Sequence, residues 1–189
     1  MRRVRLLVVV AATALLVVTG WSTAGTGASW VDSADLDGGV VRSGELSLLT
    51  GDAVTQVSAY RFDQLQAGRL RPGHHGQAPL VLANAGSVPL RHVLAGATAS
   101  EPRLGAALRL VLTPVPTTAA CPSGPDAAAP AWTPLVDAPL GSAAPSAPRV
   151  LAPGAREVVC VRVGLAAQAP STLQALTSTV VLTFRAEVA

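Results

Sequence analysis

The chain has little of what most enzymes and metal centres depend on. Its 189 residues include no lysine, two cysteines, three histidines and one tyrosine. It also lacks His-Glu-x-x-His, Gly-x-Ser-x-Gly, a Walker phosphate loop, a dinucleotide-binding fingerprint and Cys-x-x-Cys. We therefore expect a protein that is not an enzyme and that needs no cofactor.

Positive charge is concentrated at the start of the chain. The formal net charge is +3, from 14 arginines against 11 acidic residues. Residues 29–189 keep 11 of the arginines and all 11 acidic residues, so that portion is formally neutral. Nucleic-acid binding needs a clustered basic surface, and these arginines are scattered. The composition therefore predicts no nucleic-acid partner.

The first residues have the pattern of a secretory signal peptide. Arg2, Arg3 and Arg5 precede the uncharged apolar run 6–18. Thirteen residues are fewer than the ~20 that span a bilayer, but they fit the apolar region of a signal peptide. We expect export, with membrane contact only through this leader and with signal peptidase as a partner.

Small residues after the apolar run define the cleavage zone. Thr26 and Ala28 fill the −3 and −1 positions, which makes 1–28 the leader and Ser29 the mature N-terminus. Cleavage after Ala24, with Ser22 at −3, is the second choice.

Two other outcomes remain open for the leader. An uncleaved membrane anchor is one, since residues 19–21 could lengthen the span. A twin-arginine signal is the other, although the residues after the arginine pair complete that pattern poorly.

Cys121 and Cys160 are the only cysteines. In an exported chain two cysteines pair by default, and the alternative is two free buried thiols. Closing a loop of this length stabilises a fold by roughly 3–4 kcal/mol when the entropy of the unfolded chain is considered. We predict a Cys121–Cys160 disulfide.

Alternating hydrophobicity between turn residues predicts an all-β domain. Valines 159, 161 and 163 share one face, and residues 180, 182, 184 and 186 share another. The spacing of the strands favours a jelly-roll or immunoglobulin-like β-sandwich over 29–189. The expected strands are 40–49, with Leu46 and Leu48 on one face, then 53–62, 79–83, 88–94, 104–112, 156–164 and 179–187. Between them we expect a loop at 69–77, a tight turn at 84–87 and a helical turn at 171–177.

Residues 114–149 interrupt this pattern. They hold nine prolines, and their apolar periodicity is too weak for a core element. We expect a surface insertion that Trp132 pins to the domain. Because Cys160 faces away from Val159 and Val161, the disulfide would clip the insertion to the outside of a sheet.

Two sets of side chains have the composition of metal ligands. They are His74, His75 and His92, and Asp32, Asp35 and Asp37. In both cases solvated polar residues are the preferred interpretation, so we expect no metal site. The remaining glutamates, Glu45, Glu101, Glu157 and Glu187, are isolated in sequence with no partner implied.

Several blocks carry a family resemblance. They are Thr-Ala-Gly-Thr-Gly-Ala at 23–28, Trp30, Asp32, Ser33, the glycines 38 and 39, and 44–48, with weaker matches at 84–90, 151–154 and 182–187. The pattern resembles TasA/camelysin-type exported proteins, which carry the alternate, SipW-type signal peptide.

This resemblance implies a jelly-roll-like sandwich, export, and assembly into extracellular matrix fibres by strand addition. The donor strand would be 29–36, beginning Ser29, Trp30, Val31, Asp32, with Trp30 as an apolar plug. A core position for Trp30 in its own domain is the alternative. Camelysin has been described as a metal-dependent protease, but no metalloprotease motif is present here.

We therefore expect a secreted, cell-surface-associated structural protein that associates with itself or with other envelope or matrix proteins. A surface binding or adhesion module is the alternative, followed by a secreted metal-dependent peptidase.

Overall fold

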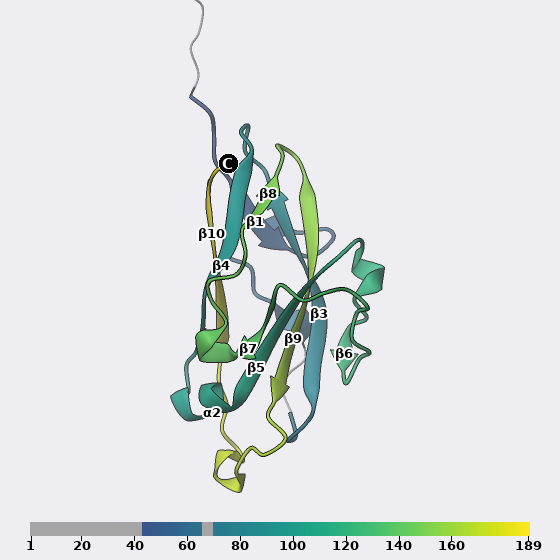
Figure 1. Ribbon diagram of the computed structural model, residues 1–189, viewed down its shortest axis with the longest axis vertical. Helices are drawn as coiled ribbons and strands as arrows, with labels where there is room; N and C mark the ends of the chain where they lie inside the picture. The colour runs from purple at the N-terminus through teal and green to yellow at the C-terminus, as the bar shows by residue number, and fades with distance from the viewer. Residues whose placement is uncertain (1–42, 66–69) are drawn as a thin grey trace, which may run out of the picture. The chain divides into compact units, whose positions relative to one another are not determined.

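Two antiparallel sheets pack face to face in the computed structural model, which describes residues 43–65 and 70–189 (Figure 1). The predicted all-β sandwich is confirmed. The leader, its cleavage residues Thr26, Ala28 and Ser29, and the donor segment 29–36 lie outside the described residues. Within the described ranges, no helix is long and apolar enough to span a membrane.

The larger sheet has the strand order β2-β1-β3-β9-β5-β7, with β6 also beside β3, and the smaller sheet has the order β10-β4-β8. The strands are β1 (Leu48–Gly51), β2 (Gln56–Val57), β3 (His75–Asn84), β4 (Leu90–Ala99), β5 (Leu108–Val115), β6 (Gly124–Pro125), β7 (Val136–Pro139), β8 (Arg149–Leu151), β9 (Arg156–Leu165) and β10 (Val180–Val188). The helical elements are α2 (Pro102–Ala107) and the 3-10 turns η1 (Asp63–Leu65), η2 (Thr118–Ala120), η3 (Leu140–Ser142) and η4 (Ser171–Leu173).

The core lies between the sheets and is aliphatic. It is built from one face of each central strand, because side chains alternate along a strand. The most deeply buried members are Leu82, Leu90, Leu94, Leu110, Leu112, Leu140, Val159, Val161 and Val163. The predicted inward face of β9 is therefore confirmed.

The last strand also follows its predicted alternation. Val180, Leu182, Phe184 and Ala186 pack against the core, while Thr183, Arg185 and Glu187 are exposed. The predicted helical turn within 171–177 is present as η4.

A β-bulge at Ala95 adjusts the pairing of β4 with β10. Thr183 pairs with Gly96 and Phe184 pairs with Leu94, so β4 carries one extra residue between them. Before the bulge the buried residues of β4 are Leu90, His92 and Leu94, and after it Ala97 is buried. The bulge thus keeps the apolar face of both halves of β4 toward the core.

Two predicted strands begin elsewhere. Residues 102–107 form α2, because Pro102 occupies the first turn and Glu101 caps it by accepting the Arg103 N–H at 3.1 Å. The strand predicted over 104–112 therefore starts only at Leu108. The strand predicted over 40–49 is β1, which starts at Leu48 and leaves Leu46 exposed. Of the strand predicted over 53–62, only the two residues of β2 are in a strand.

β3 is longer than the predicted 79–83 and takes in the end of the predicted loop. The proline at 79 does not interrupt it, because β6 pairs with residues 76–77 and β1 with residues 81–84. The backbone bond from Asn84 N to Ala155 O indicates that even-numbered residues face β9. The missing N–H of Pro79 therefore falls in the gap between β6 and β1.

The insertion predicted at 114–149 is partly a core element. β7 pairs with β5, and Val136, Leu140 and Ala143 are buried in the main core. Residues 116–135 form a surface segment, which we call the clipped loop. Trp132 does not pin it, since 46% of this side chain is exposed.

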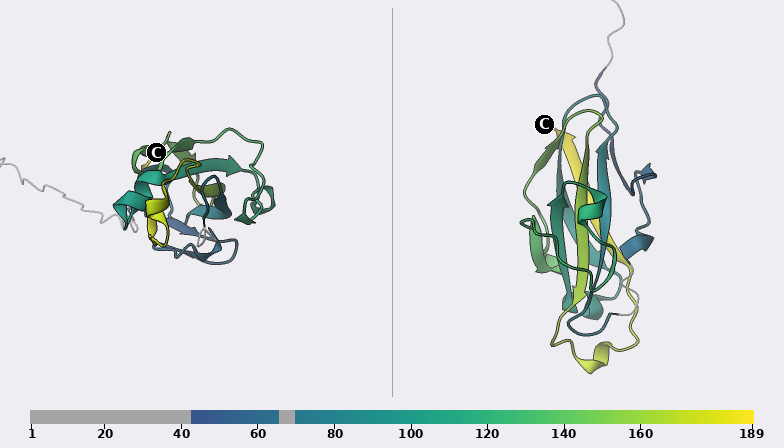
Figure 2. Two further views of the ribbon diagram at one scale, coloured as in Figure 1. Left: turned by 90° about the horizontal axis from the view of Figure 1, so that it is seen from below. Right: turned by 90° about the vertical axis from the view of Figure 1, so that its right-hand side faces the viewer.

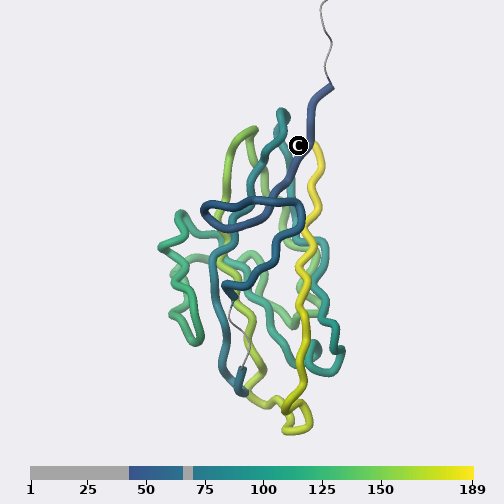
Figure 3. The backbone as a smooth tube through the Cα atoms, turned by 180° about the vertical axis from the view of Figure 1, so that it is seen from behind, coloured from purple at the N-terminus to yellow at the C-terminus, as the bar shows by residue number. Residues whose placement is uncertain are grey.

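Asn84 joins three segments at one end of the sandwich. Its amide nitrogen donates to the carbonyls of Val88 (2.9 Å) and Leu151 (3.0 Å), and its Oδ1 accepts the Gly86 N–H (3.0 Å). The turn at 85–87 is in turn bonded to residues 45–47. The first described segment and the C-terminus lie at this same end (Figures 1 and 3).

We predict that Asn84→Ala lowers the free energy of unfolding by roughly 3 kcal/mol, because it leaves buried backbone N–H and C=O groups without a hydrogen-bond partner. Urea denaturation measures the loss. Ser87→Ala, which removes one exposed bond to Glu45 N, is the matched control and should cost less than about 1 kcal/mol. Equal losses for both variants would contradict the central role of Asn84.

Candidate functional site: a clipped loop and an open sheet edge

The predicted disulfide is present. Cys121 and Cys160 are bonded, with 5.4 Å between their Cα atoms and a sequence separation of 39. Both are buried beside Val115, on the face of β9 opposite Val159 and Val161. The clipped loop therefore lies across the outer face of the larger sheet, as predicted (Figure 2, right).

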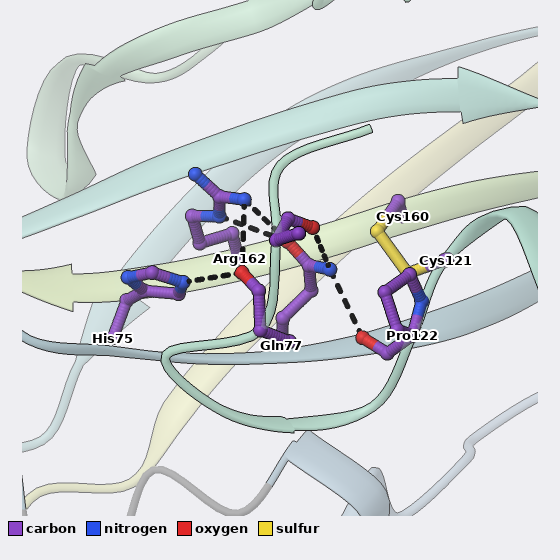
Figure 4. The surroundings of a disulfide bond; sticks show 8 residues. His75, Gln77, Cys121, Pro122, Cys160 and Arg162 are labelled. Carbon is purple, nitrogen blue, oxygen red and sulfur yellow. Dashed lines mark hydrogen bonds between the residues drawn. A yellow bond between two sulfur atoms is a disulfide. The ribbon is translucent and has the colours of Figure 1, made fainter. Parts of the chain in front are cut away.

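Gln77 is a second attachment for the clipped loop. This side chain is fully buried, and its amide nitrogen donates to the carbonyls of Pro122 (2.9 Å) and Ala128 (3.1 Å). Its Oε1 accepts from Nε (2.9 Å) and Nη2 (2.7 Å) of Arg162 on the neighbouring strand (Figure 4). With both amide hydrogens and the oxygen engaged, Gln77 fixes the loop where Trp132 does not.

His74 and His75 meet the loop at Asp126. His74 Nδ1 lies 2.6 Å from Asp126 Oδ2, and Oδ1 accepts the His75 backbone N–H at 3.2 Å. Asp126 has a φ of +52°, a conformation that aspartate tolerates better than most residues. The His74 hydrogen bond, helped by the His75 N–H, lowers the pKa of Asp126. The side chains of His74 and Asp126 are half exposed, so their contact adds little to the stability of the fold and mainly fixes the position of the loop.

The three histidines do not gather in one place. His92 is buried in the sandwich, where its Nε2 lies 3.0 Å from Glu157 Oε2 on the facing sheet. Glu157 also forms an ion pair with Arg149 of β8, although its Oε1 meets no donor at hydrogen-bond geometry. Among residues 43–65 and 70–189, no three His, Cys, Asp or Glu side chains are arranged to hold a metal ion.

The contacts of Glu157 stabilise its charged form in the folded protein. Burial alone would raise the pKa of Glu157, but the His92 hydrogen bond and the Arg149 charge outweigh burial and hold the pKa below its ordinary value. This cross-sheet cluster has no signal in the sequence, because His92 lies 65 residues from Glu157 in the chain.

β10 is a long strand with an open edge. It lies at the end of the smaller sheet and pairs only with β4 (Figure 3). Its core-facing side chains, including Leu182 and Phe184, are only half-buried, whereas Leu90 and Leu94 of β4 are at most 1% exposed. Nothing within the described ranges completes the burial of this edge.

The backbone groups on that edge can be identified. Ser100 N donates to Thr179 O, and Ala189 N donates to Pro89 O, so odd-numbered residues of β10 face β4. The N–H and C=O groups of the even-numbered residues 180–188 therefore point away from the sheet. They are available to another strand.

The other edge strands of the described chain are short. β2 and β6 have two residues each, β8 has three, and β7 has four and ends in Pro139. Short edges and proline discourage strand addition. β10 has nine residues and no proline, which makes it the best acceptor among them.

Comparison with known proteins identifies no relative, since no family model, no curated protein and no solved structure matches the chain.

We predict that replacing both cysteines by serine lowers the free energy of unfolding by roughly 4 kcal/mol, from the lost constraint on a 39-residue separation. Limited proteolysis should then cut first within residues 116–135, where the disulfide held the loop. Gln77→Ala in the oxidised protein is the comparison and should open the loop less. Unchanged protease sensitivity in the reduced protein would contradict the clip.

We also predict that acid destabilises the sandwich through Glu157. A carboxyl whose pKa is lowered by folding contributes stability above its unfolded pKa, which is lost as pH falls through the folded value. The free energy of unfolding should therefore fall as pH drops below about 4.5, the ordinary value. Urea denaturation of Glu157→Gln should show a shallower acid loss, and an unchanged slope would remove Glu157 from the explanation.

Proposed function

We propose that the protein is a non-enzymatic structural component of the cell envelope or extracellular matrix that associates with itself by strand addition. The open edge of β10 carries this proposal. Unpaired backbone groups along nine residues offer main-chain hydrogen bonds to an incoming strand. The half-buried residues Leu182 and Phe184 offer apolar surface that such a strand would cover.

The donor that fits is segment 29–36 of a neighbouring copy. Eight extended residues span about 26 Å at 3.3 Å each, which nearly matches the length of β10. Trp30 would then cover the half-buried residues of β10 beside the core. The family resemblance implies the same mode of assembly.

Location outside the cytoplasm agrees with two features. The leader pattern predicts export, and the Cys121–Cys160 bond is of a kind that persists in oxidising compartments. We therefore propose a secreted, surface-associated protein whose partners are further copies of itself or other matrix proteins.

A surface binding module is the second candidate. The clipped loop favours it, because this loop holds Trp132 exposed on a scaffold fixed by the disulfide and Gln77. Exposed tryptophans are common where proteins bind partners. A self-assembling structural protein would form oligomers, whereas a binding module would remain a monomer.

We predict that Ala186→Pro prevents assembly of the exported, processed protein. Ala186 presents its N–H to the open edge, so proline removes one edge donor without removing a bond to β4. Ala186→Val is the matched control, because it keeps the N–H. Sedimentation velocity should show large species for the parent and for Ala186→Val, and monomers for Ala186→Pro and for a deletion of 29–36.

A parent protein that stays monomeric at high concentration would contradict self-assembly and favour the binding module. Assembly that survives the deletion of 29–36 would exclude the donor.

A further inference from the structure

Residues 145–150, which we call the strap, run along the edge of β4 that faces away from β10 (Figure 1). Core residues anchor the strap at both ends, since Ala143 before it and Leu151 after it are 4% and 6% exposed. None of the side chains of the strap itself is buried, and Val150 is 61% exposed. Hydrophobic burial therefore fixes the two ends of the strap but not its middle.

Polar contacts hold the middle of the strap against β4. Leu94 N donates to Ser146 Oγ at 2.9 Å, and Ser146 N donates to Leu94 O at 3.1 Å. Arg149 pairs with His92 in the β4–β8 ladder, and its guanidinium forms an ion pair with Glu157. Because Glu157 belongs to β9, this ion pair links the strap to the larger sheet.

The ion pair depends on the charge of one carboxyl group. Glu157 faces His92 from β4 and Arg149 from β8, and it is paired with Leu82 on β3. Protonation of Glu157 removes the negative charge, whereas a guanidinium stays charged. The Arg149 side chain is 41% exposed, so its guanidinium can then turn into water. Any proton that His92 takes up adds a like charge beside Arg149 and acts in the same direction.

We propose that acid releases the strap from the edge of β4 while the sandwich stays folded. Release frees the backbone N–H and C=O groups of His92 and Leu94, because even-numbered residues in this half of β4 face the strap. The smaller sheet then has an open edge on both sides. The buried anchors Ala143 and Leu151 confine the opening to the segment between them.

The direction of the pH effect follows from the contacts of Glu157. Burial raises the pKa of this carboxyl, but the His92 hydrogen bond and the Arg149 charge outweigh burial and hold the pKa below the ordinary 4.5. Stability from such a group is present above its unfolded pKa and is lost as pH falls through the folded value. The strap should therefore be closed at neutral pH and should open progressively below about pH 4.5.

Hydrogen exchange followed by NMR tests the release in the exported, processed protein. Between about pH 7 and about pH 3.5, the amides of Leu94 and Ser146 should lose roughly tenfold in protection, after correction for the intrinsic pH dependence of exchange. The amides of Leu112 and Val161, in the centre of the larger sheet, should keep their protection over the same range.

Variants at the ion pair separate its charge from other effects of acid. Arg149→Gln, at the exposed end of the pair, should lower the protection of Leu94 and Ser146 roughly tenfold at about pH 7 and abolish the further loss in acid. Glu157→Gln should do the same. Arg156→Gln is the matched control, because Arg156 is exposed next to Glu157 and forms no ion pair within the described ranges. It should leave the acid response unaltered.

Two results would overturn the release of the strap. One is protection at Leu94 and Ser146 that stays constant in acid or falls only together with that of Leu112 and Val161. The other is an acid response that persists in Arg149→Gln. Local loss in the parent and in Arg156→Gln, without an acid response in Arg149→Gln, supports the release. None of these results depends on strand addition at β10, so the proposed function is tested separately.

Discussion

The two sheets must each bury one aliphatic face, and they are of unequal width. Three strands face a much broader sheet, so the smaller sheet cannot cover the whole apolar surface opposite it. Tyr60, Phe62, Leu65 and Leu70 pack against the remaining core on one flank, and η3 contributes Leu140. β10 lies at the margin of this arrangement, which explains why its inward side chains stay half-buried. The open edge is thus a consequence of how the core is covered.

Irregular segments are held by a few buried polar side chains. Gln77 binds the clipped loop, Asn84 binds the turns at one end, and Glu157 joins the two sheets through His92. Gln77 and Asn84 engage both their amide nitrogen and their oxygen, while Glu157 is held by the His92 hydrogen bond and the Arg149 ion pair. Hydrophobic burial stabilises the sandwich, and these side chains determine where its loops lie.

Local pattern was enough for β9 and β10, whose alternating apolar residues match their buried faces. It was also enough for the disulfide, which was predicted from the cysteine count and the expected export. The pattern failed where tertiary pairing decided the outcome. Pro79 suggested a short strand, but the gap between β6 and β1 accommodates it. Val136 and Leu140 lie among prolines, so their burial had no periodic signal. Gln77 and Glu157 could not be singled out, because the partners of Gln77 are 45 or more residues away and the His92 partner of Glu157 is 65 residues away.

The bulge at Ala95 has an implication for how β4 tolerates length changes. Before the bulge the even-numbered residues of β4 face the core, and after it the odd-numbered residues do. Deleting Ala95 would leave a regular ladder in which Leu94 stays opposite Phe184 and Gly96 stays opposite Thr183, so Ala97 would still face the core. If β4 kept all ten residues without the bulge, Ala97 would be exposed and Thr98 would face inward, so an insertion or deletion elsewhere in β4 would have to be offset by the gain or loss of a bulge.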